Sequence, residues 1–139
     1  MPHLDNTMRH REAFSRGLDL FNRAHFFDAH EVLEDVWRPL PREGPARRYM
    51  QGMVQLAVAF HHESTGNHVG ARSVLERALR NLNGADSSFP DLDLERLRAE
   101  LAIWQRYLED YESAPGGRGT ARDSRRPPAP ALPKITLRR

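Results

Sequence analysis

Residues 29–37 read Ala-His-Glu-Val-Leu-Glu-Asp-Val-Trp, and the rest of the chain can be understood as packing around this stretch. On a helix, Leu33 and Trp37 lie four residues apart and so fall on one broad side, which they share with His30 and Glu34. Burying a polar group without a partner is costly. Polar residues on the core side of a helix therefore indicate a site.

Helical spacing of apolar residues also dominates the other segments. We expect helices at about residues 8–23, 28–37, 45–65, 67–83 and 94–111, separated by stretches rich in proline and glycine. Asn6 or Thr7 is a candidate cap for the first helix. The third contains the most apolar run of the chain, residues 53–60, which is typical of a central helix. The sequence predicts an all-α fold, a single compact bundle of about five helices with a flexible C-terminal tail.

The domain organisation follows from a change of composition near residue 113. Residues 1–112 are predicted to form the helical domain, and residues 113–139 a disordered tail rich in proline, glycine and arginine. Apolar residues return at Leu132, Ile135 and Leu137. Residues 131–139 therefore have two interpretations, a docking segment on a flexible tether or simply a disordered end.

Composition excludes several classes of function. The chain contains no cysteine, which excludes disulfides, thiolate metal sites and cysteine nucleophiles. No apolar run approaches the roughly 18 residues of a membrane span, and the N-terminus is too polar for a signal peptide. We therefore expect a cytoplasmic protein without membrane contact. The net acidic residues 1–112 disfavour nucleic-acid binding, except through the basic tail.

A second set of polar residues lies on the predicted third helix. Gln51, Gln55 and His62 are spaced by four and seven residues and share one stripe. If this helix packs antiparallel to the second, Gln55 and His62 converge with His30 and Glu34. We therefore predict a buried His/Glu/Gln cluster.

Two kinds of chemistry fit such a cluster. His30, Glu34 and His62 are candidate ligands for a divalent metal such as zinc, manganese or iron. Without a metal, Glu34 and His30 are catalytic candidates, because a carboxylate that orients an imidazole supports proton transfer. Either would suit a hydrolase acting on a small polar substrate. The candidates for binding that ligand are Gln51, Gln55, Trp37 and, on the flank of its helix, Glu31.

The same residues also fit a module without catalytic activity. Buried polar side chains often tie helices together through hydrogen bonds, and Trp37 is explained as a core residue whose indole N–H finds a partner. In this interpretation the cluster only locks the helix packing of an interaction module, with a homodimer as one form. The metalloprotease motif His-Glu-x-x-His is excluded, because Glu34 stands where that motif needs its second histidine.

The motif His-Glu-x-x-Glu-x-x-Trp of residues 30–37, the run 51–57, His62 and the run 66–71 together resemble the DUF309 family of small bacterial and archaeal proteins. The resemblance covers about residues 14–85, with the order and spacing of the motifs intact. It implies an all-helical domain in which these groups cluster, and it supplies no function. His61 occupies a position that is usually apolar in the family, so we leave it out of the predicted site.

Overall fold

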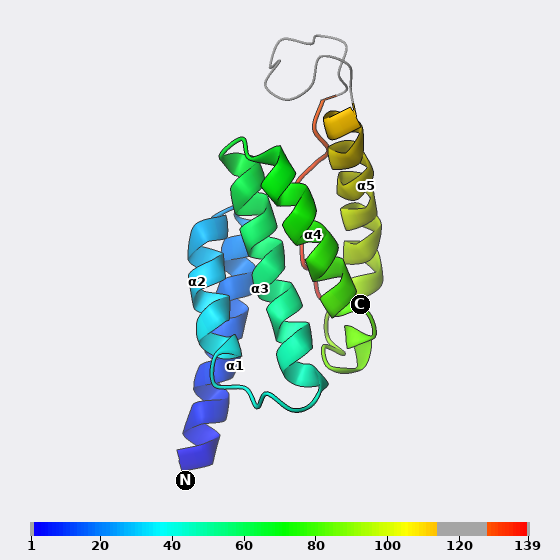
Figure 1. The fold of residues 1–139 in the computed structure, drawn as a ribbon. Helices are drawn as coiled ribbons and strands as arrows, with labels where there is room; N and C mark the ends of the chain where they lie inside the picture. The colour runs from blue at the N-terminus through cyan, green and yellow to red at the C-terminus, as the bar shows by residue number, and fades with distance from the viewer. Residues whose placement is uncertain (1, 114–127, 139) are drawn as a thin grey trace.

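The computed structural model describes residues 2–113 and 128–138, with side chains from residue 10 onward. Within them the chain forms five α-helices: α1 (Pro2–Asn22), α2 (Phe26–Trp37), α3 (Pro45–Ser64), α4 (His68–Leu82) and α5 (Leu94–Ser113), with a short 3-10 turn η1 (Ala85–Ser87). Successive helices run antiparallel, as Figure 1 shows. The predicted all-α bundle is confirmed. Residues 114–127, where we predict a disordered tail, lie outside the described part.

Helix α3 is the central helix, as its apolar run predicts. It packs on α2 along one side and on α4 along the other. The contact with α4 is close because α3 carries Gly52 at the crossing. A Cβ atom added there would lie 2.8 Å from Leu82 Cγ and 3.3 Å from the carbonyl oxygen of Ala78. The missing side chain therefore lets the two helix backbones approach.

The core is filled by aromatic side chains that connect the first three helices to α5. The rings of Phe21 and Phe26 meet edge to face with centroids 5.2 Å apart, and Phe60 meets Trp104 in the same way, also at 5.2 Å. Such edge-to-face pairs add stability beyond the area they bury. Together these rings join α1, α2, α3 and α5 in one core.

Local signals set most helix boundaries. Pro45 occupies the first turn of α3, where its missing N–H costs nothing. After α3 the chain turns at Gly66, whose φ of 85° is easily adopted only by glycine. Asn67 caps α4 by accepting a hydrogen bond from the Gly70 N–H at 2.9 Å. The predicted start of α1 is wrong, since that helix begins at Pro2 and not after a cap at Asn6 or Thr7.

An arginine ties the end of α4 and η1 to α5. Arg98 donates hydrogen bonds to both carboxylate oxygens of Asp86, at 2.6 and 3.0 Å, and to the carbonyl oxygen of Leu82 at 2.9 Å. These bonds lower the pKa of Asp86 and raise the pKa of Arg98.

In the described part of the chain, no helix combines the length and apolar character that a bilayer crossing needs.

Residues 128–138 lie in an extended conformation against α1 and α5 (Figure 1). Ile135 is part of the core and is only 4% exposed. This segment and α1 are therefore in contact although they lie at opposite ends of the sequence.

Candidate functional site

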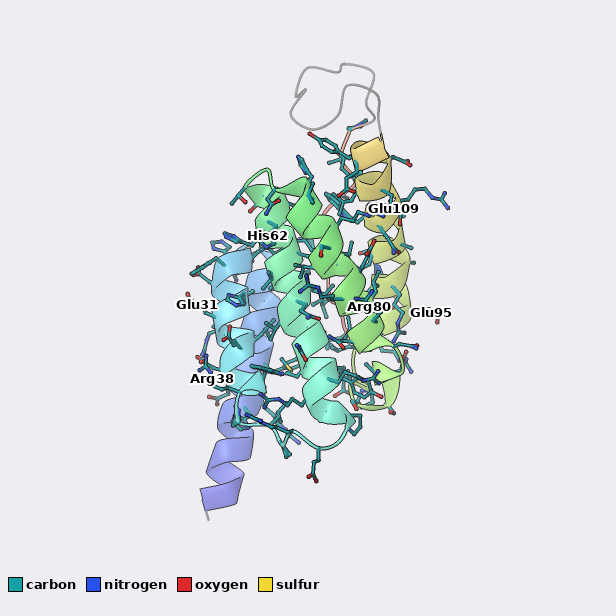
Figure 2. All side chains as sticks on the ribbon, in the orientation of Figure 1. Glu31, Arg38, His62, Arg80, Glu95 and Glu109 are labelled. Atoms are coloured by element: carbon teal, nitrogen blue, oxygen red, sulfur yellow. The ribbon has the colours of Figure 1, made fainter. Side chains whose placement is uncertain are left out.

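His30 and Glu34 form a pair on the outer side of α2. The imidazole Nε2 lies 2.8 Å from a carboxylate oxygen of Glu34, and the two side chains are 28% and 32% exposed. The other carboxylate oxygen accepts a hydrogen bond from Arg38 at 3.1 Å. Figure 2 shows Arg38, the residue directly after α2, near the surface of the bundle. Glu34 is therefore shared by two cationic or hydrogen-bonding groups of its own helix, at a half-buried position.

Gln55 and His62 have partners elsewhere. The side-chain oxygen of Gln55 accepts a hydrogen bond from Asn81 of α4 at 2.7 Å. His62, at the end of α3, lies with its Nδ1 3.2 Å from the amide nitrogen of Asn67, in the turn that leads to α4. The polar stripe of α3 thus faces α4 and the α3–α4 turn. It does not face α2.

The predicted buried cluster is wrong for this reason. Among the residues whose side chains are described, no polar or charged residue is fully buried. The four predicted residues instead belong to three separate pairs: His30 with Glu34, Gln55 with Asn81, and His62 with Asn67. Gln51 and Glu31, the other predicted ligand-binding residues, are exposed.

Trp37, the last residue of α2, packs against an arginine from α3. The guanidinium carbon of Arg47 lies 4.1 Å from the Trp37 ring centroid. The same group donates to the carbonyl oxygen of Leu40 at 2.7 Å and to that of Arg38 at 3.2 Å, so it satisfies carbonyls after the helix end. The indole N–H is buried without a partner among the described residues, so the predicted hydrogen bond of Trp37 is not found there.

An exposed aromatic ring lies where α2 begins and α3 ends. Phe27 is 51% exposed, and its ring centroid lies 6.0 Å from His30 and 5.4 Å from His61. Sequence reasoning left His61 out of the site because the family is usually apolar there. The structure places it beside Phe27 on the same surface.

Sequence reasoning also missed the most enclosed imidazole–carboxylate pair. His68 hydrogen-bonds Glu63 through its Nδ1, and their side chains are only 22% and 13% exposed. The imidazole also packs on Tyr111 of α5, with centroids 4.2 Å apart. The two partners are five residues apart across a turn, a spacing that no helical pattern highlights. The signal that could have found them is Gly66, which brings the end of α3 and the start of α4 together.

Comparison with known proteins finds a family model that matches part of the chain. Residues 14–74 match the family described as Domain of unknown function (DUF309). The resemblance to DUF309 is confirmed. The matched stretch contains His30, Glu34, Gln55 and His62, but it ends before the partner Asn81.

Two proteins with sequences similar to this chain carry names that give no function. The chain is 33% identical over 88 residues to the uncharacterised protein YpuF of Bacillus subtilis, over 63% of this chain and 49% of YpuF. It is 29% identical over 93 residues to an uncharacterised protein of Aquifex aeolicus, over 67% of this chain and 28% of that protein. The matched region thus spans half or less of each relative.

The metal prediction has no three-ligand group to support it in the described part of the DUF309-like chain. There, no three side chains from His, Asp and Glu are grouped so that they could hold a metal ion. His30 and Glu34 are neighbours, but His62 pairs with Asn67. The catalytic, ligand and metal roles of these residues, and zinc, manganese or iron as the cofactor, stay predictions.

Proposed function

We propose that this chain is a non-catalytic interaction module in which the polar side chains stabilise the helix packing. The observation that carries the proposal is the division of the predicted site residues among three separate pairs. One of these, Gln55 with Asn81, links α3 to α4. A second, His62 with Asn67, supports the turn between the same helices. Each pair thus has a structural role where it stands.

One observation favours a different function, an acid–base hydrolase. The 2.8 Å contact between Glu34 and the His30 Nε2 is the geometry in which a carboxylate orients an imidazole. Both side chains keep about a third of their surface exposed, so a small polar substrate could reach them. In this alternative His30 moves the proton. The contact between Arg38 and Glu34 argues against this alternative. An ion pair between residues four positions apart stabilises the helix, so Glu34 has a structural role without catalysis.

The two functions can be separated with Glu34→Gln, using Glu31→Gln as a matched control. Glu31 lies on the same helix but is exposed. If the pair is structural, Glu34→Gln should lower the free energy of unfolding by about 0.5–1 kcal/mol, because the side chains that Glu34 contacts are partly exposed. Glu31→Gln should change it less. Titration calorimetry with zinc and manganese should give the same result for all three proteins.

The opposite outcome would reject the interaction module. It would be an unchanged free energy of unfolding together with loss of zinc or manganese binding, or loss of a hydrolytic activity, in Glu34→Gln alone. The homodimer, a small polar ligand, nucleic-acid contact through the basic tail and the cytoplasmic location stay predictions alongside this proposal.

A further inference from the structure

The surface that holds residues 128–138 has the features of a peptide-binding site. We call residues 128–138 the C-terminal segment. It lies on Asn22 of α1, on residues 91–93 before α5, and on Glu100 and Trp104 of α5. We call these contacting residues the segment-binding surface.

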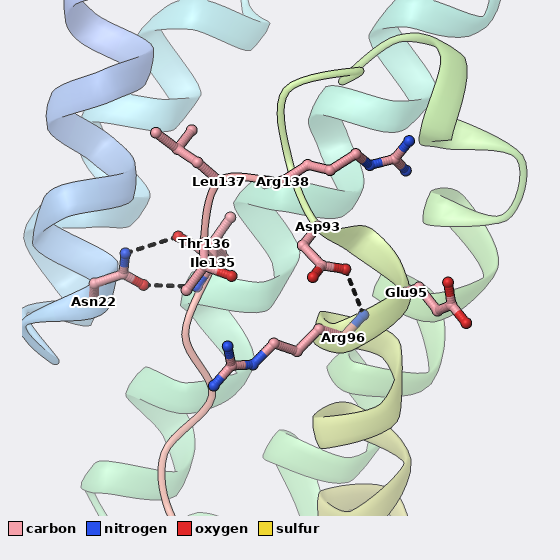
Figure 3. Close-up of a pocket in the computed structure, with 8 residues that line it drawn as sticks. All are labelled: Asn22, Asp93, Glu95, Arg96, Ile135, Thr136, Leu137 and Arg138. Carbon is pink, nitrogen blue, oxygen red and sulfur yellow. Dashed lines mark hydrogen bonds between the residues drawn. The ribbon is translucent and has the colours of Figure 1, made fainter.

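Side chains of the segment-binding surface hold the main chain of the segment. The Asn22 amide pairs with both main-chain groups of Ile135, accepting from its N–H at 2.7 Å and donating to its carbonyl oxygen at 2.9 Å (Figure 3). Trp104 donates its indole N–H to the carbonyl oxygen of Ala131 at 2.9 Å. Glu100 accepts from the N–H of Lys134 at 3.3 Å. Every extended chain carries the main-chain groups that these contacts recognise.

Further main-chain bonds extend this contact toward the end of the segment. The Asp93 N–H donates to the carbonyl oxygen of Thr136 at 2.8 Å, and the Arg138 N–H donates to that of Asp91 at 2.7 Å. They flank an antiparallel bridge between Leu92 and Leu137. Peptides that add to the edge of a folded domain are recognised in this way, with affinity from the main chain and selectivity from a few side chains.

Two side chains of the segment, Pro133 and Ile135, are buried and supply most of the selectivity. Ile135 is 4% exposed and joins the core, whereas Leu132 and Leu137 are 41% and 71% exposed. Lys134 also donates its ammonium group to the carbonyl oxygen of Asn22, at the end of α1. The recognised pattern is therefore a proline, a cation and a branched aliphatic residue in an extended chain.

Two observations indicate that the segment does not fill this surface optimally. The second carboxylate oxygen of Glu100 is buried without a partner among the described residues, which opposes docking. A pocket of about 810 Å³ also lies between residues 135–138 of the segment and Asn22, Asp93, Glu95 and Arg96 of the domain (Figure 3). Its acidic and basic groups can contact side chains that the docked segment does not supply.

We propose that the segment-binding surface is a receptor site for an extended, basic–aliphatic segment of a partner protein, and that residues 128–138 occupy it in the absence of the partner. The inference rests on the proposed interaction module and names its binding surface. The partner segment would present a proline, then a lysine or arginine, and then isoleucine or valine, as Pro133, Lys134 and Ile135 do here. Its remaining residues would reach into the adjoining pocket.

The test uses the full chain with Ile135→Asp, which removes the aliphatic group of its own segment and frees the surface. The probe is a fluorescent peptide of residues 128–138, and binding is measured by anisotropy. The variant should bind the peptide at least tenfold more tightly than the wild type, in which a tethered competitor acts at an effective concentration of about 1 mM. Adding Asn22→Leu should weaken binding at least tenfold, and a peptide with Ile135→Asp should not bind.

Other results would overturn the proposal. A folded Ile135→Asp chain that binds no peptide excludes a receptor site, and it leaves the Glu34 test of the interaction module untouched. A concentration-dependent wild-type dimer that Ile135→Asp abolishes would make a second copy the occupant. If Ile135→Asp unfolds, hydrogen exchange on the wild type decides. The proposal requires the Ile135 and Arg138 amides to exchange by local opening, and exchange only with global unfolding would refute it.

Discussion

The hydrogen bond between Gln55 and Asn81 offers a direct measurement of how polar pairs stabilise this bundle. We consider Gln55→Met, Asn81→Leu and the double variant, which keep the side-chain size while removing the polar groups. A hydrogen bond contributes about 0.5–1.5 kcal/mol net to stability. Because both side chains are half-buried, the remaining partner in each single variant can still reach water. Each single change should therefore cost about 0.5–1.5 kcal/mol, without the full penalty of an enclosed polar group.

The double-mutant cycle isolates the pair itself. The double variant should be less destabilised than the sum of the single variants by about 0.5–1 kcal/mol, because the bond can be lost only once. Urea unfolding followed by circular dichroism gives the free energies, provided that the dependence on urea is the same in all four proteins. Gln51→Met is the matched control: Gln51 lies one turn earlier on α3, is exposed, and should change stability by less than about 0.5 kcal/mol. Single changes that simply add would refute a stabilising Gln55–Asn81 bond.

Two further changes test the packing and the electrostatics. Gly52→Ala should lower stability by up to about 2 kcal/mol in thermal unfolding. Its Cβ would lie 2.8 Å from Leu82 Cγ, and overpacking costs about 1–3 kcal/mol, against a gain of about 1 kcal/mol in helix propensity. A raised melting temperature would contradict this close contact. The hydrogen bonds from Arg98 lower the pKa of Asp86, so the carboxylate stabilises the fold above its unfolded-state pKa, and this contribution is lost as the pH falls through the lowered folded-state value. Asp86→Asn should therefore reduce stability at neutral pH, by less than about 1 kcal/mol because the Asp86 side chain is 45% exposed, and the difference should disappear in acid. A difference from the wild type that stays constant with pH would contradict it.

Most of the fold could be predicted because its signals are local. Pro45 and Gly66 fix the two ends of α3 through their own backbone preferences, and Asn67 caps α4 through a contact three residues away. The placement of residues 128–138 could not be settled in the same way. Its contacts, such as Asn22 with Ile135, join residues 113 positions apart, and the local composition alone resembles that of a disordered chain.

The candidate site could be predicted only in part, because helical spacing gives the angle of a side chain but not the neighbour that it faces. His30 and Glu34 are indeed paired, since one turn of one helix brings them together. Gln55 shares a stripe with His62, but that stripe faces Asn81 of α4. The predicted cluster with His30 required the stripe to face α2 instead. Which neighbour lies on which side of α3 is decided by tertiary packing.

The contact between Asn22 and Ile135 has a consequence for the order of folding. Contacts within neighbouring helix pairs need only short loops to close, whereas this one requires nearly the whole chain to be brought together. The helical hairpins can therefore assemble first, and the segment can dock only afterwards. Until then the apolar site that Ile135 occupies in the folded chain is exposed to water. Nascent or refolding molecules therefore pass through a state in which other extended chains can compete for this site.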